Sequence, residues 1–369
     1  MNPFQYGSVV VGKDFCGRDD LIQQLQQHIE SQQNVVLYGE RRVGKTSLIF
    51  EAIRRKKSYR ALRLDLMNIK TIDALCRKFI HALGAMEQER GFFERFIKSI
   101  PALRPSLSLD PVTGMPTISL DTNVTLTINN LQEIFGLLKK YQKNKHLIVV
   151  IDEFQAILDI DDSDSAIAEL RAQVQHTPEI PFIFAGSIRH QMEAIFTAHD
   201  SPFFKAAIPL TIAPLPYEEF APFLLKRFHS GQRNISDEQM EKNFALAGGI
   251  TGDVQQFCEA LWYVTQPGET IGQKNVTAAI DLLISRERLS FQAILAKLTA
   301  KQVETLKALA TIGGHKPTSK EFMQHANSRN ASAVLKSLGR LERLKIIYQS
   351  DRTWKFMNPV LKSYLLRSH

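Results

Sequence analysis

The chain has 369 residues and a net charge of +8, and with 44% hydrophobic and 23% charged residues its composition is typical of a globular protein of two or three domains. No apolar run approaches the ~18–20 residues that span a bilayer, and the N-terminus lacks the basic stretch and apolar core of a secretory signal. Three scattered cysteines, Cys16, Cys76 and Cys258, exclude a disulfide framework and a cysteine-based zinc site. These features predict a cytoplasmic protein without a membrane partner.

The excess positive charge is concentrated near the C-terminus. Residues 299–369 hold 13 Lys and Arg against 4 Asp and Glu, a balance of 13 − 4 = +9, whereas the preceding 298 residues hold 33 basic and 34 acidic residues. This asymmetry indicates a module in the last fifth of the chain that faces a polyanion.

A phosphate-binding loop is predicted after an entry segment, residues 1–34, and a short apolar strand, residues 34–38. The loop has the spacing glycine, four residues, then Gly-Lys-Thr, and a helical pattern follows it. Its glycines would let the backbone N–H groups point at phosphate, and the following helix would offer its positive end. Lys45 would reach the β- and γ-phosphates, and the Thr46 hydroxyl would ligate Mg²⁺. The alternative is a glycine-rich turn that binds nothing. The predicted nucleotide-binding residues of this stretch are Gly39, Glu40, Arg41, Arg42, Val43, Gly44, Lys45, Thr46 and Ser47.

The next hundred residues alternate between strand and helix and then change pattern. We expect a strand at 61–67 and a helix at 72–83. After a short helical stretch at 92–100, two alternating runs about a Gly/Pro turn predict a β-hairpin insertion at about 101–125. A helix at 131–141 would return the chain to the core.

A second apolar run, His146–Ile151, has no polar alternation and ends in two adjacent carboxylates, Asp152 and Glu153. The pattern predicts a strand buried on both faces, as in a parallel sheet. With a phosphate loop upstream, Asp152 would hold Mg²⁺ and Glu153 would polarise the attacking water. The alternative is that both acids only cap the next helix.

Another buried strand is predicted at 181–187, and it ends in Ser187. Ser187 would touch the γ-phosphate or the lytic water. Arg189 either pairs with phosphate oxygens or is a solvated first-turn residue, and the residues alone leave both options open. The candidate catalytic residues are therefore Lys45, Asp152, Glu153, Ser187 and Arg189. The strand–helix alternation predicts an α/β fold with a parallel sheet and helices on both faces.

Prolines at 209, 214 and 216 predict a boundary, after which residues 217–298 show only helical patterns. The expected organisation is a nucleotide-binding core at 1–215, a helical lid at 216–298 and a third domain at 299–369.

The third domain shows three helices and a small hairpin, the pattern of a winged helix. Its third helix, at 328–344, carries four basic side chains that would contact the phosphates of DNA: Arg329, Lys336, Arg340 and Arg343. The alternative is that the winged helix docks a protein partner and that these side chains are only solvated.

The whole pattern resembles the archaeal-type ATPases, a branch of P-loop ATPases close to AAA+ proteins and to the STAND signalling ATPases. The resemblance covers nearly the whole chain and rests most on Gly39–Thr46 and Leu147–Glu153. Phe15–Arg18 is similar to the family's glycine-arginine motif, which lies against the nucleotide in relatives, so the resemblance implies that Arg18 contacts the ligand. Phe184–Ser187 resembles the sensor-one strand. The implied fold is an AAA+-like P-loop NTPase core, a helical lid and a C-terminal winged helix.

Two positions depart from the family pattern. Lys205 stands where many members have the arginine of a Ser-Pro-Leu-x-x-Arg-like stretch, and Lys lacks the planar fork of Arg. Gln255 stands where the similar lid motif of replication-initiator ATPases has an arginine. A completing arginine would then come from Arg189 or from a neighbouring subunit. These departures predict slow turnover.

The predicted function is a Mg²⁺-dependent ATPase that acts as a nucleotide-driven switch, with ATP and ADP as its ligands. The absence of an Asn-Lys-x-Asp stretch favours adenine over guanine. The winged helix would bind DNA or a protein partner. The alternative function is a signalling or defence ATPase of the STAND type that forms homo-oligomers on a trigger and docks protein through its winged helix.

Overall fold

The computed structural model describes residues 2–56, 58–86, 105–109, 116–120, 125–142, 146–350 and 352–367. The chain divides into two compact units, Val9–Ala213 and Met1–Ser8 together with Pro214–His369. No helix in the described ranges is long and apolar enough to cross a membrane.

The first unit is built on a five-stranded parallel sheet with the strand order β2-β5-β6-β1-β7. Its strands are β1 (Val35–Tyr38), β2 (Tyr59–Asp65), β5 (His146–Asp152), β6 (Phe182–Gly186) and β7 (Ile208–Thr211). Every residue of β1 and β6 is buried, which explains why their sequences are continuous apolar runs. The strand β6 lies between β1, which leads into the predicted phosphate loop, and β5, which ends in the carboxylates. The predicted parallel sheet is confirmed.

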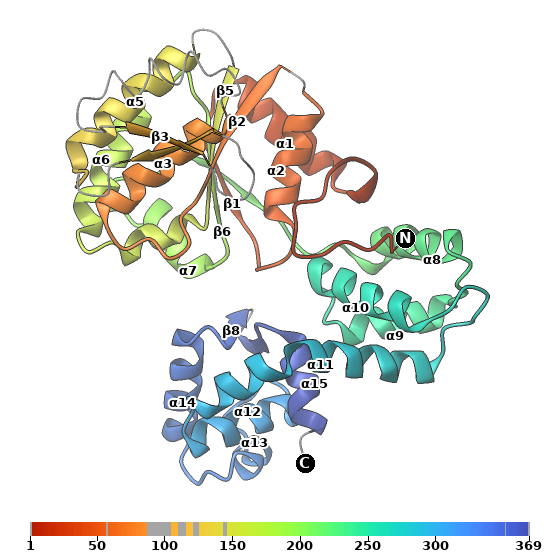
Figure 1. The fold of residues 1–369 in the computed structure, drawn as a ribbon. Helices are drawn as coiled ribbons and strands as arrows, with labels where there is room; N and C mark the ends of the chain where they lie inside the picture. The colour runs from red at the N-terminus through yellow and green to blue at the C-terminus, as the bar shows by residue number, and fades with distance from the viewer. Residues whose placement is uncertain are drawn as a thin grey trace. The chain divides into compact units, whose positions relative to one another are not determined.

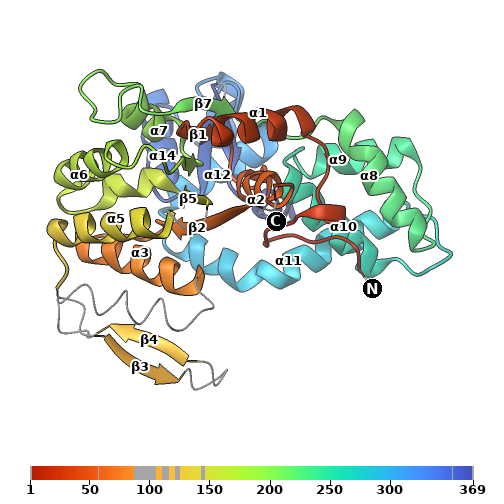
Figure 2. The ribbon, with the colours of Figure 1, turned by 90° about the horizontal axis from the view of Figure 1, so that it is seen from above.

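Helices cover both faces of this sheet (Figure 1; Figure 2 gives the view from above). On one face lie α1 (Asp19–Glu30) and α2 (Lys45–Arg54), and on the other lie α3 (Ile72–Met86), α5 (Ile128–Gln142) and α6 (Ser163–Gln175). The second face packs on a core whose centre is aromatic: Phe154, Phe184, Phe196 and Phe203 have ring centroids 4.7–5.6 Å apart. This packing holds the ends of β5 and β6 in place.

Several short elements of the first unit had no clear sequence signal. The helix α7 (Arg189–Phe196), the strand β7 and the 3-10 turns η1 (Gly12–Asp14) and η3 (Phe154–Asp159) were not predicted. The strand β7 has four residues and contains Pro209, which is tolerated because the strand lies at the edge of the sheet.

A separate antiparallel pair, β3 (Pro105–Leu109) and β4 (Pro116–Leu120), occupies the region of the predicted hairpin insertion. The connection between these strands and the predicted helix at 92–100 lie outside the described residues.

The second unit begins with four helices that the sequence predicted as a lid: α8 (Tyr217–Ser230), α9 (Asp237–Leu246), α10 (Thr251–Val264) and α11 (Gln273–Ala296). The N-terminal residues of the chain pack on this group, where the Phe4 ring lies 4.6 Å from that of Phe228 and 6.0 Å from that of Trp262. The helix α11 is longer than the predicted 276–285 and ends only three residues before the capping residue of the next helix, Thr299.

The C-terminal elements form a winged helix, as predicted: α12 (Ala300–Ile312), α13 (Lys320–His325), α14 (Ala331–Arg343), β8 (Ile347–Ser350), β9 (Thr353–Phe356) and an additional α15 (Pro359–Arg367). Side chains cap the three core helices, because Thr299, Ser319 and Asn330 each accept a hydrogen bond from a first-turn N–H. A Cβ on Gly314 would lie 2.0 Å from the Trp354 carbonyl oxygen, so glycine is required where the wing crosses the end of α12.

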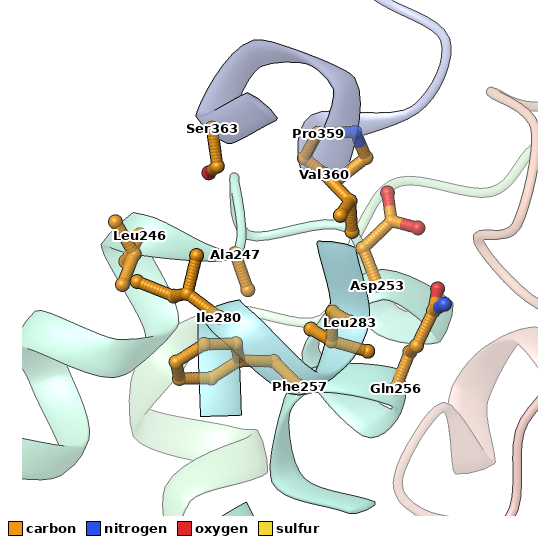
Figure 3. A pocket seen from close by; sticks show the side chains of 10 residues that line it. All are labelled: Leu246, Ala247, Asp253, Gln256, Phe257, Ile280, Leu283, Pro359, Val360 and Ser363. Atoms are coloured by element: carbon orange, nitrogen blue, oxygen red, sulfur yellow. The ribbon is translucent and has the colours of Figure 1, made fainter. Parts of the chain in front are cut away.

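The winged helix is packed against the lid helices within this unit. Gln256 of α10 donates to Glu287 Oε1 at 3.1 Å, and Asn358, just before α15, donates to the other oxygen of Glu287 at 2.5 Å. Figure 3 shows the side chains of Pro359 and Val360 above the lid helices, where they close a cavity of about 20 Å³. A cavity of this size holds little more than one water.

Candidate nucleotide-binding site

The loop between β1 and α2 has the backbone of a phosphate-binding turn. Gly44, the residue before α2, has φ +96°, a conformation that favours glycine. Gly39 needs to be small for another reason, since a Cβ there would lie 2.4 Å from Ile212 Cγ2 and 2.8 Å from the Ile212 carbonyl oxygen. Because α2 begins at Lys45, its first N–H groups and its positive end face this loop.

Lys45 is held inside the loop. Its side chain is buried, and its Nζ donates to the carbonyl oxygens of Gly39 and Glu40, each at 3.0 Å. Burial lowers the pKa of Lys45, and the charges of Glu153 and Asp152 oppose that shift. The amine therefore lies in an electrostatic environment that contains both predicted carboxylates.

Thr46 and Asp152 are in direct contact. The Thr46 hydroxyl donates to Asp152 Oδ2 at 2.6 Å, and Arg63 lies 3.6 Å from the same oxygen. Burial raises the pKa of Asp152, an effect that the Thr46 hydrogen bond opposes and the Glu153 charge reinforces. A hydroxyl and a buried carboxylate are the hard oxygen donors that Mg²⁺ takes, and Mg²⁺ commonly uses only one or two protein ligands beside substrate phosphates. This pair therefore fits the predicted Mg²⁺ site, and the described residues hold no cluster of three or more His, Cys, Asp or Glu that could bind a metal alone.

Glu153 and Ser187 also meet. Ser187 Oγ donates to Glu153 Oε2 at 2.8 Å. Gln155, which the sequence analysis did not single out, donates its side-chain amide to the same carboxylate oxygen. Glu153 has φ 50° and ψ 42°, a left-handed backbone that costs a non-glycine residue about 1–3 kcal/mol and is often found at functional sites.

These contacts arise because β1, β5 and β6 are adjacent parallel strands whose carboxyl ends lie at one edge of the sheet. Ligands bind at that edge in open α/β sheets. The structure thus brings together five of the predicted residues: Lys45, Thr46, Asp152, Glu153 and Ser187.

Arg18 lies beside the loop as well. It precedes α1 with φ 65°, and its Nη2 donates to the Ala213 carbonyl oxygen at 3.0 Å. A Cβ placed on Gly44 would lie 3.4 Å from Arg18 Nη1, which puts the guanidinium next to the loop glycine.

Arg189 has a different environment. Its exposed side chain pairs with Glu193 one helical turn later, at 2.8 Å. Burial raises the pKa of Tyr38 at the end of β1, the Glu193 charge raises it further and the Arg189 charge lowers it. The Arg189–Glu193 pair therefore lies near the entrance to the loop, with its guanidinium engaged by a carboxylate.

The remaining predicted loop residues differ in burial. Val43 is fully buried, Arg41 is exposed, and Arg42 has a left-handed φ of 65°. Ser47 is buried, and its hydroxyl accepts a hydrogen bond from the Val10 N–H at 3.1 Å.

Glu51 is a second residue that the sequence analysis missed. It is 1% exposed, and its carboxylate accepts hydrogen bonds from the Gly12 N–H at 2.8 Å and from the guanidinium groups of Arg54 and Arg55. The two arginines and the Gly12 N–H lower the pKa of Glu51 to about 2. The signal in the sequence was a carboxylate within the apolar run 48–53. Glu51 ties the segment that carries Arg18 to the helix that carries Lys45.

The two positions that depart from the family pattern make local contacts. Lys205 has φ 53° and its Nζ lies 5.2 Å from the centre of the Phe204 ring. Gln255 is buried in α10, and its Oε1 has no hydrogen-bond partner among the described residues.

The predicted nucleic-acid residues lie on the surface of the winged helix. All four are exposed: Arg329, Lys336, Arg340 and Arg343. Arg329 precedes α14, and the other three lie on this helix at a spacing that places them on one face. Leu335 and Leu344 are exposed beside them. Within the described part of the chain none of the four forms an ion pair.

Comparison with known proteins identifies the fold and the family of this chain. A family model described as an ATPase domain predominantly from Archaea matches residues 15–257, and a model of a probable winged helix domain matches residues 289–367. A Walker-type ATPase of Pyrococcus abyssi superposes with a TM-score of 0.65 at 17% identity, over 99% of each chain. The Orc1 protein of Aeropyrum pernix, solved in complex with DNA, gives a TM-score of 0.56 at 13% identity, over 97% of this chain and 94% of that chain. No curated protein matches the sequence.

The two structural likenesses show only the fold, because both sequence identities are low. The family match is more informative, since it covers well over half of the chain and includes every residue gathered at the sheet edge. The chain therefore belongs to the family of ATPase domains found predominantly in Archaea, and it carries a winged helix domain at its C-terminal end.

Proposed function

We propose that the protein binds and slowly hydrolyses ATP with Mg²⁺ and uses the nucleotide as a switch. The observation that carries this proposal is the meeting of Lys45, the Thr46–Asp152 pair and the Glu153–Ser187 pair at the carboxyl edge of one sheet. Membership of an ATPase family supports the choice of ligand.

Each group would act on the triphosphate in one way. Lys45 and the α2 N-terminus would bind the β- and γ-phosphates, and Thr46 and Asp152 would hold Mg²⁺, which neutralises phosphate charge. Glu153 would accept a proton from water as the water oxygen bonds to the γ-phosphorus and the bond to the ADP oxygen breaks. Ser187 would donate to a γ-phosphate oxygen. A completing arginine would come from Arg189, after it leaves Glu193, or from a neighbouring subunit.

The switch proposal rests on how the chain passes between its two units. It crosses once between Ser8 and Val9 and once between Ala213 and Pro214. Just inside the first unit, the Val10 N–H donates a hydrogen bond to the Ser47 hydroxyl of α2, and Arg18 beside the loop donates one to the Ala213 carbonyl oxygen. A bound nucleotide that displaced either hydrogen bond would directly change the backbone at a point where the chain passes from one unit to the other.

The lid and the winged helix would then move as one body, because Glu287 joins α10 to Asn358 and the ring of Phe291 packs on that of Tyr364. We propose three functional segments within this scheme: a core at 1–215, a lid at 216–298 and a winged helix at 299–369, with residues 1–8 of the core segment packed on the lid.

The test is binding and phosphate release by the full chain with Mg²⁺-ATP, beside Lys45→Ala. We expect the wild type to bind ATP and ADP and to release phosphate slowly, and the variant to lose both properties. Wild-type protein that neither binds nor hydrolyses ATP would overturn the proposal.

A second candidate function is DNA binding by the winged helix, and the exposed basic face of α14 favours it. Phosphate contacts make such binding steeply salt-dependent. The Orc1 structure with DNA shows a protein of the same fold bound to this ligand. The alternative is a protein partner, or assembly into homo-oligomers on a trigger.

Fluorescence anisotropy with a DNA duplex at several salt concentrations separates these options. Reversal of two charges on the face, Arg340→Glu with Arg343→Glu, should abolish binding at the higher salt concentrations, and the weak binding left at low salt should have a salt slope about two units smaller. A control with the same charge change elsewhere, Lys274→Glu with Lys362→Glu, should keep most of the affinity. Equal losses of affinity in the two double variants would mean that net charge alone explains the binding.

The alternatives have their own readouts. No DNA binding even at low salt would favour a protein partner, and mass measurement of the protein with ATP, with ADP and with neither would detect oligomers.

A further inference from the structure

The carboxylate of Glu153 is held from two sides. Gln155 Nε2 donates to Glu153 Oε2 at 2.5 Å, and Ser187 Oγ donates to the same oxygen at 2.8 Å. Ser187 follows β6, whereas Gln155 belongs to the turn η3 that follows Glu153 itself. One oxygen of the carboxylate, Oε2, thus accepts two hydrogen bonds, and Oε1 accepts neither of them.

Gln155 is held firmly in this position. It is 5% exposed, and its neighbour Phe154 is fully buried in the aromatic core, with its ring centroid 4.7 Å from that of Phe184. Ile157 is fully buried on the same turn, and the Ala156 N–H donates to the Glu153 carbonyl oxygen at 2.9 Å. The turn is therefore anchored by core packing, and the Gln155 amide has little freedom to move.

The neighbouring strand leaves room for this amide. A Cβ on Gly186 would lie 2.5 Å from Gln155 Oε1 and 2.4 Å from Met192 Sδ. Gly186 has no left-handed φ, so the requirement for glycine is one of space. Gly186, the last residue of β6, thus leaves the space between β6 and η3 that the Gln155 amide fills.

We propose that Gln155 is the positioning residue of Glu153. This inference rests on the proposed function, in which Glu153 is the base and Ser187 donates to the γ-phosphate. The Ser187 hydroxyl has one proton, so it cannot donate to Glu153 and to a phosphate oxygen at the same time. When Ser187 turns to the phosphate, Gln155 remains as the donor that keeps the carboxylate aimed, and the other carboxylate oxygen is left to accept from water.

The kinetic test compares variants of the full chain that keep the size of the side chain. Gln155→Met and Gln155→Glu both lose the amide donor, and we expect kcat to fall at least about tenfold with KM for ATP within about threefold, because orientation of a general base affects the chemical step. Gln173→Met is the matched control, since Gln173 donates to Glu169 at 2.7 Å on α6 and loses an equivalent amide–carboxylate bond. This control should retain kcat. If Gln155→Met retains kcat while wild type turns over, the inference fails.

A second measurement does not depend on activity. In protein labelled with ¹⁵N-glutamine, the side-chain amide of Gln155 is the resonance pair that Gln155→Met removes. We expect this pair to shift in both Glu153→Ala and Ser187→Ala, and to stay in place in Glu169→Ala, which removes the acceptor of the control glutamine. An unmoved pair in Glu153→Ala would overturn the inference. Should wild type show no turnover, the proposed function fails, and this shift alone decides whether Gln155 holds Glu153.

Discussion

The sheet edge and the basic face of α14 are both sets of polar groups, but they are held in opposite ways. At the edge, Asp152 is buried and bonded to Thr46, and Glu153 is bonded to Ser187 and Gln155. On α14, Lys336 and Arg340 are exposed and form no ion pair within the described part of the chain. Buried polar groups must be satisfied in one arrangement, whereas exposed charges remain solvated. Substitutions of these polar side chains should therefore act on stability and chemistry at the edge, and on binding alone at the basic face of α14.

The largest expected effect is that of Asp152→Asn. Burial raises the pKa of Asp152, so the ionised carboxylate costs stability at neutral pH, a cost that disappears as pH falls through the raised pKa. Removing the charge should therefore raise the melting temperature without ligand, while Mg²⁺-dependent ATP turnover falls about 100-fold or more. Thermal denaturation and phosphate release measure the two effects. A variant that loses stability and keeps turnover would contradict the assigned role.

Glu51→Gln should have the next largest effect. The folded pKa of Glu51 is about 2 against 4.5 in a model peptide, so its ionisation stabilises the fold above pH 4.5 and this contribution is lost as pH falls through about 2. At 1.36 kcal/mol per pKa unit, the contribution at neutral pH is about 3 kcal/mol. Urea unfolding should show this difference at pH 7 and a smaller one at pH 3. A difference that is independent of pH would mean that packing, not charge, stabilises this site.

Two glycine-to-alanine changes compare the regions directly. Gly186→Ala places a Cβ against Gln155 and Met192, and it should cost about 1–3 kcal/mol of unfolding free energy. Gly339→Ala lies on α14 with nothing within 4 Å of the new Cβ, and it should add about 0.5–1 kcal/mol through helix propensity. Chemical denaturation measures both. If both substitutions change the unfolding free energy in the same direction, the contrast between the packed sheet edge and the exposed α14 is wrong.

The charge reversal on α14 should have the smallest effect on stability. Arg340→Glu with Arg343→Glu changes two exposed side chains, and the unfolding free energy should change by about 0.5 kcal/mol or less per substitution. A much larger loss would show that these arginines support the fold and would weaken the DNA-binding experiment.

The sequence predicted those parts of the site that are local in the chain. Gly39–Thr46 and the acids after β5 are recognised by spacing, and the burial of β5 by its apolar run. Parallel strands then made it possible to expect that Ser187 lies near Glu153.

Other parts depend on contacts between distant segments and left little trace in the sequence. The strand β7 has four residues and one proline, and it is a strand because β1 pairs with it. Gln155 matters because β6 brings Ser187 and Gly186 against its turn, and Glu51 matters because Gly12 returns to α2. A single polar residue in an apolar run indicates burial but does not name its partner.

The most direct test of the account is ATP turnover and ATP binding by Glu153→Gln, measured side by side with wild type. The variant keeps the size of the side chain and removes its ability to accept a proton. We predict that it binds Mg²⁺-ATP with an affinity within about threefold of wild type and releases phosphate at least about 100-fold more slowly. Turnover at the wild-type rate would contradict the role of Glu153, and with it the proposed mechanism at this sheet edge.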